Sequence, residues 1–240
     1  MPGTLDELVS TQATNAASDA PLSRRTSAKP PRGWVGSSLH WFGIACLLGA
    51  AGCGGFIVWT LWGTGLTTSA AQHRLGINFH SLQQPAVHIP PPPGWAPIPG
   101  SLYGEIVIPA IGLNAYVVQG TDYGALQNGP GHYVNTANPW DPTGRVGIAG
   151  HRTTYLHPFF HLDLLKPGDT ITIRTTTYGD YTYRVSQVFV LPTSIAGRVL
   201  AQTPKPTLVL TTCNPTYSSA ERLIVTADRI SAPVPAPATP

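Results

Sequence analysis

The sequence has few charged residues: they make up 10% of its 240 positions, whereas about 25% is usual for a soluble domain. Its 14 Lys and Arg residues outnumber its 11 Asp and Glu residues by only three, and so small a net charge argues against a nucleic-acid-binding protein. It has only three cysteines, which excludes a scaffold built on disulfides. Apolar residues are not scarce, because 42% of the chain is hydrophobic, and this content excludes complete disorder.

The shortage of charge is concentrated near the N-terminus, where no Lys, Arg, Asp or Glu occurs between Arg32 and Arg74. Within this gap residues 39–66 are almost all apolar, Gly or Thr, and the segment is long enough for a membrane-spanning helix of about 20 residues. Trp41 would lie about 27 Å along such a helix from Trp59, which has Trp62 beside it, so these tryptophans would mark the two membrane interfaces. A cleaved signal peptide is one alternative, but its apolar region is usually about half as long. A buried soluble helix is the other, and the seven glycines in residues 39–66 disfavour it.

The charges on either side of the predicted span indicate its orientation. Arg74 is the only charged residue that follows the span before Glu105, whereas four basic residues precede it: Arg24, Arg25, Lys29 and Arg32. By the positive-inside rule we predict a single-pass membrane protein, with a cytoplasmic N-terminus and everything beyond the span outside the cell.

Three further segments have the composition of chain without a packed core. Residues 1–38 are rich in Ser, Thr, Ala and Pro without apolar periodicity, and we expect a disordered cytoplasmic tail. Residues 67–100 contain no acidic residue and include the proline run 90–93, which predicts an extended, semi-rigid stalk outside the membrane; a polyproline ligand for a partner is the alternative. Residues 231–240 are mostly Ala and Pro, and we expect a flexible tail.

Between residues 101 and 230 the sequence changes to short β-type segments separated by turn signals such as Gly-Pro-Gly and Lys-Pro-Gly-Asp. Residues 123–127 and 159–165 are expected to form single helical turns, which are too short to cover a parallel sheet. We therefore predict an all-β domain, either a closed or nearly closed β-barrel or a sandwich. The predicted strands are Tyr103–Ile108, Ala115–Val118, Arg145–Ala149, Thr170–Thr175, Tyr181–Leu191, Thr207–Thr212 and Arg222–Ile230.

Cys213 is the only cysteine outside the predicted span, because Cys46 and Cys53 lie within it. A lone external cysteine is a free reactive thiol, an intermolecular bridge or a buried small apolar residue. Its position favours the first of these, since the strand 207–212 leads into Cys213 and Pro215 stops the strand. We therefore expect the thiol at a strand end, where a rigid scaffold presents reactive groups.

Two other residues are placed to assist this thiol. If the strands 207–212 and 222–230 pair as a hairpin, Arg222 lies close to Cys213, where a guanidinium lowers a thiol pKa and donates to an oxyanion. A surface Arg on an edge strand is the alternative. A nucleophilic Cys also needs a proton donor for its leaving group, usually His, and His151 follows the end of the predicted strand 145–149.

The remaining histidines of this region are weaker candidates. His132 lies in a Gly-rich loop, and we expect a structural role. His157 and His161 have the i, i+4 spacing of a helical metal pair, but no carboxylate stands at a ligand-like position on the same helix. We therefore expect no metal and no cofactor.

Taken together, these motifs resemble the sortases, a family of bacterial cysteine transpeptidases. The resemblance rests on residues 129–133 (Gly-Pro-Gly-His-Tyr), 148–152 (Ile-Ala-Gly-His-Arg), 164–169 (Leu-Leu-Lys-Pro-Gly-Asp) and 210–215 (Leu-Thr-Thr-Cys-Asn-Pro), followed by Glu221-Arg222. It spans about residues 100–230 and is greatest to the class E sortases. One departure is the segment 135–143, which contains Trp140 where class E members usually have a Gly- and Pro-rich loop.

The resemblance implies an eight-stranded sortase β-barrel, and it implies a role for each candidate residue. Cys213 would attack the Thr carbonyl of a sorting signal, either Leu-Ala-x-Thr-Gly or Leu-Pro-x-Thr-Gly, near the C-terminus of a secreted protein. His151 would protonate the leaving amide nitrogen, and Arg222 would hold the substrate backbone and the oxyanion. Thr212 would contribute to substrate binding as an oxyanion donor. The acceptor would be an amine from a peptidoglycan precursor or a pilin Lys. A peptide-binding module without cleavage and a hydrolytic cysteine peptidase are the alternatives.

Overall fold

The computed structural model describes residues 34–83 and 97–232. Most of the predicted N-terminal tail, residues 84–96 of the predicted stalk and the C-terminal tail beyond residue 232 lie outside the described residues. The chain divides into two compact units, residues 1–48 and 49–240. The described residues of the first unit are all helical, and the second unit contains the β domain.

A continuous helical stretch carries the apolar segment. It consists of α1 (Trp34–Val58), the π-helical turn η1 (Trp59–Gly63) and α2 (Thr64–Leu82). The part from Gly36 to Leu82 is long and apolar enough, by length and composition, to cross a membrane. The helix extends further than we predicted, because residues 67–82, which we expected to be extended, form most of α2. The prolines that disfavour a helix begin only at Pro85.

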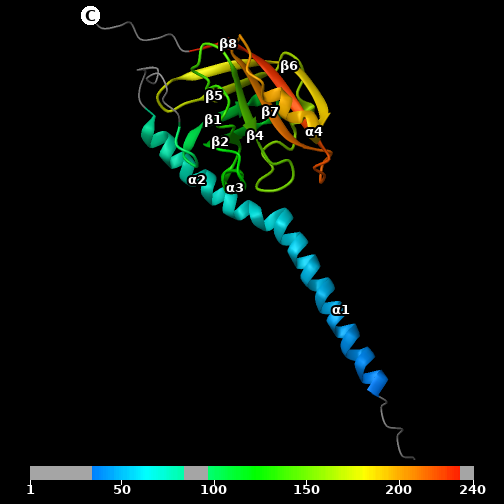
Figure 1. Ribbon diagram of the computed structural model, residues 1–240. Helices are drawn as coiled ribbons and strands as arrows, with labels where there is room; N and C mark the ends of the chain where they lie inside the picture. Colours follow the sequence, from blue (N-terminus) through cyan, green and yellow to red (C-terminus); the bar gives the residue numbers. More distant parts are fainter. Residues whose placement is uncertain (1–33, 84–96, 233–240) are drawn as a thin grey trace, which may run out of the picture. The chain divides into compact units, whose positions relative to one another are not determined.

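One face of α2 packs against the β domain, beside β2 and α3 (Figure 1). Gln72 makes three hydrogen bonds there: its amide nitrogen donates to the carbonyls of Tyr116 (2.8 Å) and Asn128 (2.7 Å), and its Oε1 accepts from the Tyr116 N–H (2.8 Å). Gly76 permits a close approach, since a Cβ at this position would lie 2.8 Å from the ring of Tyr116. These directed contacts fix α2 to the β domain. The buried residues of α2 are Thr64, Thr68, Ala71, Gly76 and Phe79.

Eight strands close into a barrel in the order β1-β2-β3-β4-β7-β8-β6-β5 (Figure 1). The pairs β2–β3 and β4–β7 are parallel, and the other neighbours are antiparallel. The strands are β1 (Leu102–Ile108), β2 (Leu113–Gln119), β3 (Gly131–His132), β4 (Arg145–Ala149), β5 (Thr170–Arg174), β6 (Asp180–Pro192), β7 (Thr207–Asn214) and β8 (Glu221–Ser231). The short helices of the barrel are η2 (Pro109–Ile111), α3 (Tyr123–Asn128), η3 (Leu162–Leu164), α4 (Thr193–Ala196) and η4 (Gly197–Leu200).

The period-2 alternation of β7 decides which of its side chains enter the barrel. Leu208 and Leu210 belong to the interior core, and each fully buried Leu stabilises the fold by about 2 kcal/mol. Val209 points to the other side, where it packs with Val199 and Ile224 in a small outer cluster beneath η4. By the same alternation Thr212 faces the interior, and Cys213 faces outward on the side of Val209.

The all-β fold is confirmed, and each of the seven predicted strands is present. The structure adds β3, which has only two residues and therefore leaves no periodicity to detect. The predicted helical turn at 123–127 is α3, whereas within 159–165 only Leu162–Leu164 is helical. The helices α4 and η4, between β6 and β7, were not predicted.

Candidate active site

Cys213 and Arg222 are cross-strand neighbours. The antiparallel register of β7 and β8 pairs Cys213 with Arg222 and Asn214 with Glu221, so the predicted hairpin is confirmed. On β8, Leu223 lies in the interior core, and alternation turns Arg222 to the same outer face as Cys213. The thiol and the guanidinium therefore share one face of the barrel, at the end where β7 stops and β8 begins.

His151 follows the end of the strand on the other side of β7. The parallel register of β4 and β7 pairs Ala149 with Thr211, and the Gly150 N–H donates to the Thr211 carbonyl at 3.1 Å. Continuing this register by two residues brings His151 level with Cys213. The strand ends of β4, β7 and β8 thus carry all three predicted residues to the same end of the barrel.

His151 occupies an environment that favours the neutral imidazole. The side chain is half-buried, and burial lowers the pKa of His151 below its usual value of 6.5. The ring of Tyr155 lies 4.8 Å from that of His151, centroid to centroid. The His151 Nε2 is buried and has no hydrogen-bond partner among the described residues. A neutral imidazole has one unprotonated nitrogen, which is the form that a general base requires.

Thr212 does not share the outer face of β7 with Cys213. Its side chain is buried, and its hydroxyl donates to the Gly150 carbonyl at 2.8 Å. This hydrogen bond holds the backbone immediately before His151. The predicted use of Thr212 as an oxyanion donor is therefore not available to its hydroxyl, because strand alternation turns that group away from Cys213.

The guanidinium of Arg222 is fixed by the loops at the end of the barrel. It is half-buried, and its Nη1 donates to the Thr193 hydroxyl (3.2 Å), the Ser219 carbonyl (3.0 Å) and the Glu221 carbonyl (2.9 Å). These contacts come from the start of α4 and from the β7–β8 loop. They restrict the rotamers of a long side chain before any ligand arrives, so less side-chain entropy is lost on binding.

Arg152, for which we predicted no role, lies beside the candidate site. It is 6% exposed, and its Nη1 donates to the Cys213 carbonyl (3.3 Å) and to the Asn214 side chain, while its Nη2 pairs with Asp163 (3.2 Å). The Asn214 amide in turn donates to Glu221 at 2.8 Å. This network ties the strand ends of β4, β7 and β8 together. Its one signal in the sequence is a charged residue three positions after the end of a buried strand, in a chain where charge is scarce.

The loop after His151 has an unusual backbone. Tyr155, Leu156 and His157 have φ values of 53°, 61° and 39°, a left-handed conformation that costs about 1 kcal/mol or more for each non-glycine residue. Neighbouring side chains hold the loop: the Tyr155 N–H donates to the Thr64 hydroxyl (3.3 Å), and the Tyr155 hydroxyl lies 2.9 Å from that of Tyr123. The end of the apolar helix therefore takes part in positioning the residue that contacts His151.

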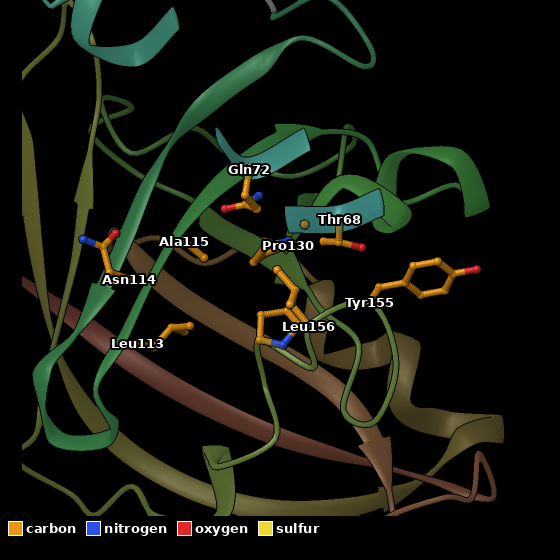
Figure 2. Close-up of a pocket in the computed structure, with 10 residues that line it drawn as sticks. Thr68, Gln72, Leu113, Asn114, Ala115, Pro130, Tyr155 and Leu156 are labelled. Carbon is orange, nitrogen blue, oxygen red and sulfur yellow. The ribbon is translucent and has the colours of Figure 1, made fainter. Parts of the chain in front are cut away.

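A cavity of about 160 Å³ lies beneath this loop, between α2 and β2 (Figure 2). Thr68 and Gln72 line it from α2, and Leu156 lines it from the loop. The ring of Tyr155 points away from the cavity (Figure 2). The ring of Tyr155 lies beside the ring of His151. The cavity leaves the neighbouring part of the loop, at Leu156, incompletely packed.

The other histidines differ in burial. His132 is buried in β3, where its ring stacks on Tyr103 at 4.2 Å and its Nδ1 lies 2.8 Å from the Gln119 Oε1, so its place is structural as predicted. His157 and His161 are exposed. Within residues 34–83 and 97–232, no group of three or more His, Cys, Asp or Glu side chains could hold a metal ion.

Known proteins share this architecture. A family model for the sortase domain matches residues 106–230. Sortase D of Bacillus subtilis is 32% identical over 119 residues, which cover 50% of this chain and 58% of that protein. Sortase SrtE1 of Streptomyces coelicolor is 28% identical over 184 residues, which cover 71% of this chain and 51% of that protein. The chain thus spans little more than half the length of these curated relatives.

Among solved structures, sortase E1 of Streptomyces coelicolor, crystallised with a tripeptide in its active site, is similar with a TM-score of 0.50 and 28% identity. The similarity covers 57% of this chain and 92% of that one. The family model for the sortase domain, residues 106–230, matches the barrel.

Proposed function

The chain belongs to the sortase family, and on that premise we propose that it is a membrane-anchored cysteine transpeptidase. It cleaves a sorting signal of the Leu-Ala-x-Thr-Gly or Leu-Pro-x-Thr-Gly type after Thr and transfers the resulting acyl group to an amine of the cell wall. The observation that supports this proposal is the strand register: Arg222 of β8 pairs with Cys213 of β7, and His151 follows two residues after Ala149, which pairs with Thr211 of β7.

The first half-reaction uses the proton of the thiol. The neutral imidazole of His151 accepts the Cys213 proton as the sulfur attacks the Thr carbonyl carbon. When the tetrahedral intermediate collapses, the C–N bond breaks and His151 gives that proton to the leaving amide nitrogen. The products are an acyl-thioester on Cys213 and a peptide that begins with Gly.

The second half-reaction reverses these roles. An acceptor amine attacks the thioester carbonyl, His151 takes the proton from the amine nitrogen, and Cys213 leaves as a thiol. We assign to the Arg222 guanidinium the stabilisation of the oxyanion in both tetrahedral intermediates, and its hydrogen bonds to Thr193 and Ser219 limit its mobility. Groups of this kind typically contribute a factor of about 10²–10³ to kcat.

The apolar helix supports a location at the membrane surface. Four basic residues precede it and only Arg74 follows it before the barrel, which favours a cytoplasmic N-terminus and a barrel outside the cell. The substrates on that side are secreted proteins that carry the sorting signal, and the acceptor is an amine of a peptidoglycan precursor or of a pilin.

The test uses the full chain in detergent micelles or liposomes, with each signal peptide and an amine nucleophile. We expect a thioacyl adduct on Cys213 by mass spectrometry and a product that carries the amine. Cys213→Ala abolishes both, whereas Cys46→Ala serves as the matched control and retains both.

Three outcomes would contradict the proposal. Equal activity of the wild type and Cys213→Ala shows that the thiol is not the nucleophile. A product that the added amine never changes indicates a hydrolytic peptidase. Peptide binding without any adduct indicates a binding module.

A further inference from the structure

An apolar surface lies where the turn η1 meets the loops at the end of the barrel. A pocket of about 210 Å³ is lined by Leu61, Trp62, Thr153, His157, Phe160 and Tyr217. No Lys, Arg, Asp or Glu side chain lines it. The first two of these residues belong to η1, the next three to the loop after His151, and the last to the loop after Cys213. One surface therefore joins the apolar helix to the loops that follow both predicted catalytic residues.

Two aromatic side chains that line this pocket are exposed within the described unit. Trp62 is 69% exposed and Tyr217 74%, whereas Leu61 and Phe160 are half-buried. Leu156, which lies in the same loop as Phe160 and lines the cavity described above, is 43% exposed. Large apolar side chains grouped on one face of a soluble protein mark an interaction surface. Aromatic residues near the end of an apolar helix are typical of the membrane–water interface in particular.

The helix geometry sets the depth of this surface. Trp62 and Thr64 are only about 3 Å apart along the helix axis at 1.5 Å per residue, and the Thr64 hydroxyl already accepts the Tyr155 N–H at 3.3 Å. The interfacial layer on each side of the hydrocarbon core is about 5–8 Å thick. If Trp62 lies at the edge of the hydrocarbon core, the part of the loop 153–160 that binds Thr64 therefore lies within the headgroup layer.

The hydrogen bonds of α2 keep the barrel from moving away from the apolar helix. Thr68 donates to the Gln127 carbonyl at 2.8 Å, and Gln72 bonds the backbone of Tyr116 and Asn128. No extended linker separates the apolar helix from the first of these contacts, since residues 64–82 are helical.

We propose that the surface formed by Trp62, Leu156, Phe160 and Tyr217 lies in the headgroup layer of a phospholipid bilayer, and that the pocket opens to lipid. The proposal rests on the membrane anchorage proposed above. It places the loops after His151 and Cys213 in the interface, so that the thiol faces substrates that are themselves held at the membrane.

The experiment uses the full chain in liposomes of phosphatidylglycerol and phosphatidylethanolamine. The photoreactive residue p-benzoylphenylalanine replaces Leu156 or Tyr217, and in a third protein it replaces Ile230. Ile230 is the matched control for Leu156, because its exposure of 46% is close to the 43% of Leu156. It lies eight residues beyond Arg222 on β8, about 26 Å from Arg222 along the strand. After irradiation, the lipid adducts are measured by mass spectrometry, and circular dichroism confirms that each variant is folded.

We expect phospholipid adducts at positions 156 and 217 in several-fold higher yield than at position 230. Equal yields at the three positions, or a crosslinked dimer of the chain in place of lipid, overturn the proposal. Flotation of the liposomes separates this failure from failure of the anchor itself: a chain that does not float with the vesicles contradicts the proposed anchorage, whereas one that floats without adducts contradicts only the proposed surface.

Discussion

Replacing Thr212 with Val removes one hydroxyl and keeps a side chain of similar shape. The hydroxyl donates to the Gly150 carbonyl at 2.8 Å in a fully buried setting, so the substitution leaves that carbonyl without its partner. A buried polar group that loses its partner costs about 1–3 kcal/mol. For a domain of this size each kcal/mol lowers Tm by roughly 2–4 °C, so we expect Tm to fall by about 2–12 °C.

The same substitution tests what Thr212 does in the reaction. Because Gly150 immediately precedes His151, a loosened backbone misplaces the imidazole, and we expect kcat to fall while KM for the signal peptide stays close to that of the wild type. Thr212→Ser retains the hydroxyl, so it recovers most of the lost Tm and kcat. Calorimetry and steady-state kinetics on the three proteins provide these values.

One result would refute this reasoning. If Thr212→Val leaves Tm unchanged and raises only KM, the hydroxyl contacts the substrate, and the side-chain direction derived from strand alternation is wrong. A Ser variant that behaves like the Val variant would likewise show that the hydrogen bond to Gly150 does not contribute to the free energy of unfolding.

Three other perturbations test the fold around the site. Burial lowers the pKa of His132 from 6.5 to about 4, so the unfolded chain takes up a proton first as the pH falls, and stability is lost between pH 6.5 and 4 by up to about 1.4 kcal/mol per pH unit. Urea unfolding of His132→Gln should show a flatter pH dependence, and equal slopes would contradict this origin. Gly150→Ala places a Cβ 2.6 Å from the Phe159 ring, so Tm should fall by several degrees and partly recover with Phe159→Leu; purely additive effects would exclude the clash. Gln72→Leu removes the hydrogen bonds to Tyr116 and Asn128, and hydrogen exchange in α2 should accelerate; unchanged protection would mean that packing alone holds the helix.

The parts of the fold that were predictable are those with local signals. The strands with alternating apolar residues were found within a few residues of their ends, and Pro215 correctly marked the end of β7. The helix α2 was missed because its buried face consists mainly of Thr, Ala and Gly, which contrast little with its exposed face. In addition, the prolines from Pro85 onward led us to predict an extended conformation for the whole segment 67–100.

The residues of the candidate site likewise differ in how well they could be predicted from local sequence. The pairing of Cys213 with Arg222 follows from a short hairpin, so the sequence was sufficient to predict it. The contributions of Arg152 and Tyr155 depend on contacts with β7 and with the apolar helix, which are distant in sequence. No local pattern encodes such contacts, because they exist only after the barrel has closed.

The parallel pairing of β4 with β7 has a consequence for the timing of activity. The Gly150–Thr212 hydrogen bond joins residues 62 apart in sequence, and β5, β6 and the helices after β6 must all be traversed before the two strands meet. Contacts of such long range form late, because loop-closure entropy opposes them. In an emerging or partly folded chain, the Cys213 thiol is therefore present before the end of β4 lies beside β7. Under the proposed mechanism, the acid–base partner of the nucleophile arrives only with the native topology, so the fold delays the proposed chemistry until folding is complete.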